Sequence, residues 1–141
     1  MAARLAPPPP VPVFDSEAHA LAGLRAFFQL MERWGVGNEE ARVLLGRPSP
    51  RTLYNWKAGR AGRLPHDTMR RISYLLGIHK ALRILFGEPA NTYGWLRRPN
   101  ADFGGQAPLA RMLAGDVTDL AAVRRYLDAA RGAGAVGPPG G

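Results

Sequence analysis

Apolar residues recur every three or four positions along most of this chain of 141 residues, and no useful stretch alternates between apolar and polar residues. This spacing is typical of helices and predicts an all-α protein. The first helix should begin at Asp15 or Ser16, which are good N-cap residues, and should end before Gly35. Its apolar face is predicted to contain Leu21, Leu24, Phe28 and Met31, with Phe27 and Trp34 beside them.

Two short helices joined by a tight turn are predicted next. Asn38 can cap the first of them, and Gly46 should end it. Ser49 followed by Pro50 is a typical helix start, and Gly59 should end the second helix. This stretch therefore has the pattern helix, four-residue turn, helix.

Gly77 and Gly87 divide the next part of the chain. Apolar stripes on either side of Gly77 predict a fourth and a fifth helix, and beyond Gly87 we expect a loop. A short helix from Pro108 to Gly115 and a last helix from about Thr118 should follow. The stripes of the fourth, fifth and last helices contain Met69, Ile72, Leu75 and Leu76; Ile78, Leu82, Leu85 and Phe86; and Leu120, Val123 and Leu127. The middle stripe could form a homodimer interface or part of an intramolecular core.

The composition of the two ends differs from that of the middle. Residues 1–14 hold a cluster of prolines, which predicts a disordered, extended arm, and residues 132–141 are a flexible tail rich in Gly, Pro and Ala. Between them we expect a helical domain over residues 15–87 and a small helical module over residues 88–131. The lack of cysteine, of a signal peptide and of a long apolar run predicts a cytoplasmic protein without a membrane span.

The net charge of +8 is concentrated in one part of the chain. Residues 42–83 contain ten Lys or Arg and a single acid, Asp67, whereas the regions before and after carry net charges of −2 and +1. Genomic base bias could explain why 17 of the 19 basic residues are arginine, but it does not explain their clustering. Such a block attracts polyanions, and it coincides with the predicted helix-turn-helix, which indicates DNA binding.

The second helix of this motif has the two faces that a recognition helix needs. Leu53 and Trp56 can anchor it to the core, while Arg and Asn side chains near its N-terminus can read guanine and adenine. The candidate DNA-binding residues are Ser49, Arg51, Thr52, Asn55, Lys57, Arg60 and Arg63. The alternative is a helical hairpin of a bundle with a solvated basic face.

The region after Gly87 is too rich in apolar and turn residues to be a tail. The series Trp95-Leu96-Arg97-Arg98-Pro99-Asn100, followed by Phe103-Gly104-Gly105-Gln106-Ala107-Pro108-Leu109, resembles the toxin-binding domain of the Xre/MbcA/ParS antitoxins. Upstream, Leu44-Leu45-Gly46 and then Arg51-Thr52-Leu53 and Trp56 resemble the Xre-like helix-turn-helix of the same proteins. The resemblance covers roughly residues 20–128 and is more specific in its second half.

This resemblance implies an antitoxin of a type II toxin–antitoxin system. Such antitoxins mask the active site of a RES-domain toxin, which consumes NAD or transfers ADP-ribose, and they bind operator double-stranded DNA as homodimers to repress their own operon. The candidate toxin-binding residues are Trp95, Asn100, Phe103, Gly104, Gly105, Arg125 and Tyr126. Trp95 and Phe103 could equally be core residues, whereas Tyr126 should lie nearer the surface. The alternative function is a stand-alone helix-turn-helix regulator without a toxin partner.

Candidate catalytic groups are sparse. His19, His66 and His79 are far apart and lack the spacing of metal ligands or of a nucleophile and its base. The Gly-containing loop at residues 60–63 lacks the sequence of a phosphate-binding loop. We therefore expect no enzyme activity, no metal and no cofactor.

Overall fold

The structure is a computed structural model that describes residues 17–132. These residues form seven α-helices and one short 3-10 helix and contain no strand, which confirms the all-α prediction. The predicted N-cap at Asp15 or Ser16, the Pro-rich arm and all of the predicted tail except Gly132 lie outside the described residues.

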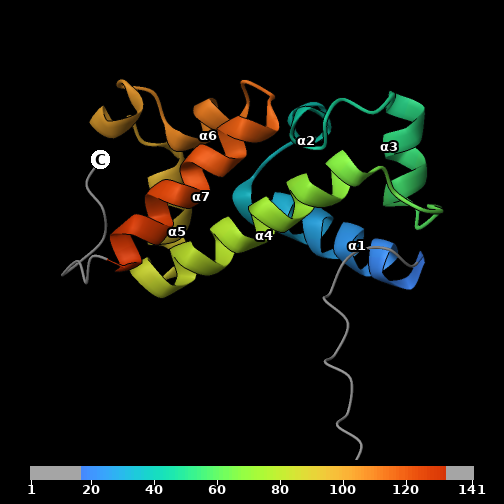
Figure 1. Cartoon of the computed structure of the whole chain (residues 1–141), viewed down its shortest axis with the longest axis horizontal. Coiled ribbons are helices and arrows are strands. Elements are labelled where there is room, and N and C mark those ends of the chain that lie inside the picture. Colours follow the sequence, from blue (N-terminus) through green and yellow to red (C-terminus); the bar gives the residue numbers. More distant parts are fainter. Residues whose placement is uncertain (1–16, 133–141) are drawn as a thin grey trace, which may run out of the picture.

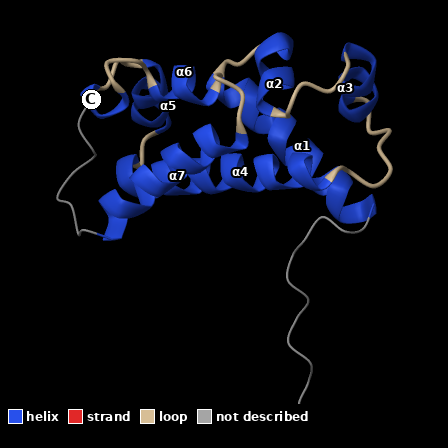
Figure 2. Ribbon diagram, turned by 45° about the horizontal axis from the view of Figure 1, so that its top comes forward, coloured by secondary structure: helices blue, strands red, loops and turns tan. Residues whose placement is uncertain are grey.

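Helix α4 forms the centre of the molecule and packs against α1, α5 and α7 (Figure 1). The other main contacts pair α1 with α3, α5 with α6, and α6 with α7. In Figure 2 the long helices lie along the lower side, with the short helices above them. The elements are α1 (Glu17–Trp34), α2 (Asn38–Leu44), α3 (Pro50–Lys57), α4 (His66–Phe86), α5 (Pro89–Arg97), η1 (Ala101–Phe103), α6 (Pro108–Met112) and α7 (Val117–Gly132).

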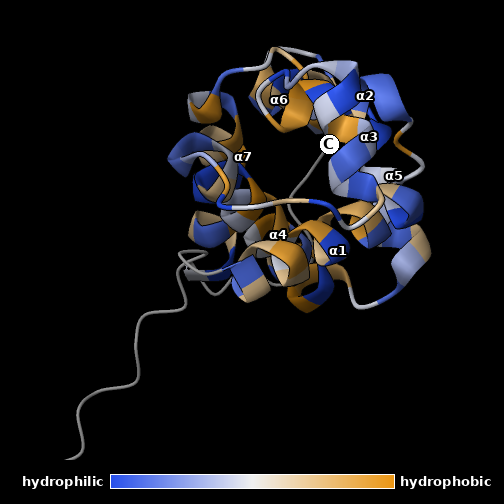
Figure 3. Cartoon of the chain, turned by 90° about the vertical axis from the view of Figure 1, so that its right-hand side faces the viewer, coloured by the Kyte–Doolittle hydropathy of each residue, from blue (hydrophilic) through white to orange (hydrophobic). Residues whose placement is uncertain are grey.

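One hydrophobic core extends through both predicted units. The largest fully buried side chains are Leu24, Phe27, Trp34, Leu44, Leu45, Ile72, Leu75, Ile78, Leu82, Trp95, Leu96 and Met112. The predicted apolar face of the last helix is also buried and packs against α4. In Figure 3 hydrophobic colour marks stretches of α1, α4 and α6, whereas α3 is largely hydrophilic. The domain boundary after residue 87, which remains a prediction, falls just beyond the end of α4.

The buried face of α1 is rotated relative to the predicted one. Leu24 and Met31 are buried as expected, but Leu21 and Phe28 are only partly buried, and Phe27 lies fully inside. The reason is that α1 has two neighbours. Its core side faces α4, while Leu21 and Phe28 face the end of α3.

Gly77 does not separate two helices, because α4 runs without interruption from His66 to Phe86. A Cβ atom at position 77 would collide with the guanidinium group of Arg124 from α7. The glycine therefore permits the close approach of a neighbouring side chain rather than ending a helix. Ile78 and Leu82, on the predicted dimer stripe, are 0% exposed inside this chain, so for them the intramolecular-core alternative is correct.

The loop expected after Gly87 is also wrong, because this region contains α5. Gly87 has a φ of 74°, Glu88 is the extended N-cap residue, and Pro89 occupies the first turn, where its missing N–H is not needed. The helix places Trp95 and Leu96 on its buried face. The short helix begins at Pro108 as predicted but ends at Met112 rather than near Gly115, and the last helix forms as predicted.

Candidate nucleic-acid interface and aromatic cluster

Helices α2 and α3 and the turn between them form the predicted helix-turn-helix. The turn passes through Gly46 and Arg47, which both have positive φ values, of 93° and 62°. Arg47 is the only non-glycine residue with positive φ among the described residues. The side chain of Arg42 spans the turn, donating to the carbonyl oxygen of Pro48 at 3.0 Å and pairing with Glu39 at 2.7 Å. The turn therefore has a fixed geometry.

Ser49 is the N-cap of α3, as predicted. Its Oγ accepts a hydrogen bond from the backbone N–H of Thr52 at 3.1 Å and donates to Thr52 Oγ1 at 2.9 Å. Pro50 occupies the first turn of the helix. In the free chain both hydroxyls therefore stabilise the start of α3, at the helix end that suits a phosphate.

The two faces of α3 separate as expected. Leu53 is buried, and Trp56 is partly buried against the core. On the opposite face, Arg51 is exposed and has no hydrogen-bond or ion-pair partner among the described residues. Asn55 is partly buried, and its Oδ1 accepts a hydrogen bond from Nη2 of Arg60 at 3.1 Å.

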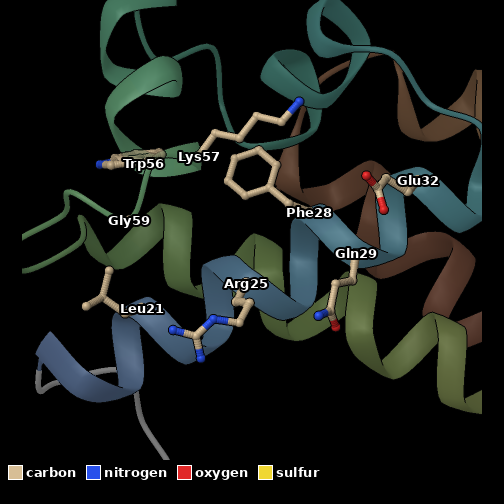
Figure 4. Close-up of a pocket in the computed structure, with 8 residues that line it drawn as sticks. All are labelled: Leu21, Arg25, Phe28, Gln29, Glu32, Trp56, Lys57 and Gly59. Atoms are coloured by element: carbon tan, nitrogen blue, oxygen red, sulfur yellow. The ribbon is translucent and has the colours of Figure 1, made fainter.

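Lys57 is exposed, and its side chain reaches from the end of α3 toward the start of α2. Its Nζ donates to Asn38 Oδ1 at 3.0 Å. The same atom lies 6.0 Å from the ring centroid of Phe28, and Figure 4 shows these two side chains next to each other. The prediction that Asn38 caps α2 is wrong, because Gly37 is the N-cap and Asn38 is the first helical residue. The side chain of Asn38 instead holds the end of α3 against the start of α2.

Behind α3, toward α1, lies a groove of about 250 Å³. Its apolar walls come from Leu21 and Phe28 of α1 and Trp56 of α3, and Arg25 and Glu32 stand at its edges (Figure 4). Since Trp56 lines this groove and Arg51 does not, the groove lies away from the face of α3 that carries Arg51.

The positive charge of residues 42–83 is only partly engaged within the chain. Arg71 is 8% exposed and pairs with Asp67 at 2.7 Å. Arg60 lies over the ring of Tyr54, with its Cζ 5.6 Å from the ring centroid. Arg63, in the loop after α3, is exposed without a partner among the described residues. Arg51 and Arg63 therefore place unpaired positive charge at α3 and the loop that follows it, and further exposed charge of this block lies on α4, at Arg70, Lys80 and Arg83.

A cluster of four aromatic side chains occupies the other half of the molecule. Trp95 is 1% exposed, and its ring centroid lies 6.1 Å from Phe86, 6.3 Å from Phe103 and 6.1 Å from Tyr126. Phe103 and Tyr126 are 5.0 Å apart. Trp95 and Phe103 are thus core residues, which resolves the alternative that the sequence left open, and Tyr126 is partly buried at the edge.

Tyr126 also makes a short polar contact at the surface. Its hydroxyl donates to Asp102 Oδ2 at 2.6 Å, which links α7 to η1. Burial, together with this hydrogen bond and the charge of Asp102, raises the pKa of Tyr126 to about 12. The tyrosine therefore stays protonated over the whole neutral range.

The loop beside this contact is a tight turn built around Asn100. This residue is 1% exposed, its Oδ1 accepts from the N–H of Asp102 at 2.9 Å, and its carbonyl oxygen accepts from Gly105 at 3.0 Å. Gly104 and Gly105 have φ values of 68° and 88° and are exposed. Arg125 of α7 is exposed too and has no partner among the described residues. Of the candidate toxin-binding residues, the two glycines and Arg125 therefore lie on the surface.

Two arginines that the sequence analysis did not select join the two halves. Arg97 Nη2 donates to the carbonyl oxygens of Trp34 and Gly35, at 2.8 and 2.9 Å, and so caps the end of α1. Arg47 lies against Gly115 in the turn before α7. Arg47 belongs to the basic block of residues 42–83, and Arg97 belongs to the series that resembles the toxin-binding domain, but neither pattern indicates which arginines turn toward the rest of the chain.

Residues 17–132 contain no cluster of three or more His, Cys, Asp or Glu side chains that could hold a metal ion. The pKa of His79 is lowered by burial and by the positive charges of Arg33 and Arg83. Within the same residues, no helix has the length and apolarity needed to span a membrane.

Comparison with known proteins gives separate matches for the part of the chain that contains the helix-turn-helix and for the part that contains the aromatic cluster. Residues 14–77 match the family described as the antitoxin Xre-like helix-turn-helix domain, and residues 81–133 match the antitoxin Xre/MbcA/ParS C-terminal toxin-binding domain. The chain is also 46% identical over 121 residues to the uncharacterized protein y4oB of Sinorhizobium fredii, covering 86% of this chain and 92% of that protein.

Proposed function

The chain belongs to the Xre/MbcA/ParS antitoxin family, and on that basis we propose that it binds and neutralises a RES-domain toxin and represses its own operon by binding operator DNA. One observation carries the proposal. The match to the toxin-binding domain covers the aromatic cluster and the Asn100 turn, while the match to the helix-turn-helix covers most of the basic block. These matches support our proposal that the two activities use different surfaces of one folded unit.

For DNA binding, α3 is the proposed recognition helix. Arg51 projects from its exposed face and would contact base edges in the major groove, while Arg63 would contact phosphates. A homodimer would place two such helices on the two halves of a palindromic operator. Ser49 and Thr52, at the N-terminus of α3, would lie next to the DNA backbone.

For toxin binding, we assign the contact surface to the Asn100 turn and the neighbouring part of α7. The exposed backbone at Gly104 and Gly105 and the free guanidinium of Arg125 would touch the toxin directly. Trp95 and Phe103 would not touch the toxin themselves. Their buried rings pack against Tyr126 and so support the Asn100 turn. The antitoxin would inhibit by covering the active site of a cytoplasmic enzyme, without itself being a catalyst.

The proposal is tested by co-expressing the chain with a RES-domain toxin encoded beside it. We expect the wild-type chain to restore growth and to co-purify with the toxin. Arg125→Glu should weaken both effects, whereas Lys80→Glu, an equal charge change at an exposed position of α4, should weaken neither. Growth arrest that persists with the wild-type chain would contradict toxin neutralisation. Retained operator binding would then favour the stand-alone regulator.

A further inference from the structure

Tyr54 is the most exposed large hydrophobic side chain of the described structure, at 68%. It lies in the middle of α3, within the basic helix-turn-helix. An aromatic ring that stays exposed to water gains no stabilisation from burial in the free chain. It can gain that stabilisation by packing against a binding partner. The exposed ring of Tyr54 is therefore a candidate contact for a binding partner.

Helical geometry places Tyr54 on the face of α3 opposite to its anchors. With 3.6 residues per turn, Arg51, Tyr54 and Ala58 form one line, and all three are exposed. Trp56 points to the other side, toward α1, and Leu53 is buried between the two faces. The ring thus shares the surface that carries the free guanidinium of Arg51, and the small side chain of Ala58 lets another surface approach closely.

Arg60 holds this arrangement in place. Its backbone N–H donates to the carbonyl oxygen of Asn55 at 2.8 Å, so the chain folds back over the end of α3. Its guanidinium then lies 5.6 Å from the centroid of the Tyr54 ring and donates to Asn55 Oδ1 at 3.1 Å. Three side chains are therefore fixed against one another before any ligand binds.

We propose that Tyr54 determines operator specificity, by placing its ring against the C5-methyl group of a thymine in the major groove. This inference rests on the proposed DNA binding. Among the base edges of the major groove, the thymine methyl group is the one that offers an apolar contact. The occupant is duplex DNA rather than an apolar protein, because Arg60 lies over the ring, Arg51 lies one turn away on α3, and the nearby acid Glu39 is paired with Arg42. The contact uses the ring and not the hydroxyl group.

The test replaces thymine by uracil, which lacks only that methyl group, one position at a time in duplex DNA from the region upstream of the coding sequence. Affinity is measured for the full chain and for three variants. Tyr54→Ala removes the ring, and Tyr54→Phe removes only the hydroxyl. Ile84→Ala, at the other large exposed hydrophobic residue (55% exposed), is the matched control on α4.

For the wild-type chain we expect at least one position in each half-site where uracil weakens binding about fourfold, the equivalent of one buried methyl group. Tyr54→Phe and Ile84→Ala should show the same loss of affinity on replacement of thymine by uracil as the wild type. Tyr54→Ala should bind the thymine-containing and the uracil-containing DNA equally. Specific binding without such a position, or a difference that survives in Tyr54→Ala, overturns the inference and leaves the proposed function standing. The absence of any sequence-specific binding overturns both.

Discussion

The guanidinium of Arg47, in the turn between α2 and α3, lies against Gly115, in the turn between α6 and α7. A Cβ atom on residue 115 would lie 2.6 Å from Arg47 Nη1, and Gly115 has a φ of 100°. The helix-turn-helix and the C-terminal half therefore meet at a junction that only glycine accommodates without strain.

Gly115→Ala should destabilise the protein by about 1–3 kcal/mol, because it combines an unfavourable backbone conformation with a clash against Arg47. Gly94→Ala is the control, since Gly94 lies within α5 and a Cβ atom there would meet nothing within 4 Å. This variant should stay as stable as the wild type or gain up to about 1 kcal/mol. Urea unfolding measures both, and equal stabilities of the two variants would contradict the close packing at this junction.

Ser49→Ala should lower the free energy of unfolding by about 1 kcal/mol, because it removes the hydrogen bond that caps α3. Ser73→Ala makes the same chemical change at an exposed position in the middle of α4 and should cause no loss. Thermal unfolding followed by circular dichroism compares the two. A smaller loss for Ser49→Ala than for Ser73→Ala would show that Ser49 does not stabilise the helix start.

The raised pKa of Tyr126 predicts that the free energy of unfolding changes with pH in the alkaline range. Its pKa in the folded chain, about 12, is above the ordinary value of 10 in an unfolded chain. The stabilisation is therefore complete below pH 10 and is lost as the pH rises toward 12. Tyr126→Phe should remove this dependence and lower stability at neutral pH by about 1 kcal/mol through loss of the hydrogen bond to Asp102. The chain has four tyrosines, so the pKa of Tyr126 is obtained from the difference between the tyrosinate absorbance titrations of the wild type and Tyr126→Phe, and a value at or below 10 would contradict this environment.

Arg51→Ala should weaken binding to operator DNA by about 1–3 kcal/mol while changing non-specific binding little, because it removes a base contact. Asn55→Ala should have the same sign, with an added effect on Arg60, which loses its hydrogen-bond acceptor. Arg63→Ala should instead weaken binding to all sequences and reduce the salt dependence. Mobility-shift titrations at several salt concentrations separate these effects. Binding that does not depend on salt or on Arg51 would argue against DNA recognition by α3.

Helix starts with strong local signals could be predicted from the sequence. Ser49-Pro50 and Pro108 each begin a helix where expected, because capping and the fixed φ of proline act within one turn. The prediction that Gly77 separates two helices is wrong. A glycine that ends a helix and a glycine that leaves room for a neighbouring side chain cannot be told apart from the sequence alone. α5 was missed because it buries only Thr92, Trp95 and Leu96, too few for a clear stripe.

The sequence predicts which helices carry the candidate residues, but it does not predict how their side chains are oriented. The exposed position of Arg51 follows from helical periodicity, whereas the contact of Lys57 with α2 depends on Asn38, far away in the sequence. The folding back of Arg60 onto Tyr54 and Asn55 depends on the path of the chain after α3. The burial of Trp95 and Phe103 likewise needs α4, η1 and α7 to come together, which no local pattern specifies.

The structure makes truncation a poor way to test toxin binding. Removing the chain after Arg111 would delete α7, whose residues Leu120, Val123 and Leu127 are at most 1% exposed and complete the core. Point changes at the surface of α7 are the appropriate alternative, because Arg125 is exposed and packs against nothing that the core requires.

The most direct measurement is the rate of NAD loss catalysed by the purified RES-domain partner as this chain is added. The account predicts that an excess of the wild-type chain or of Lys80→Glu stops NAD loss. Arg125→Glu should need a concentration about tenfold or more higher, corresponding to about 1.4 kcal/mol of binding free energy. A rate of NAD loss that stays unchanged in an excess of folded wild-type chain would contradict the claim that this protein neutralises its toxin by binding it.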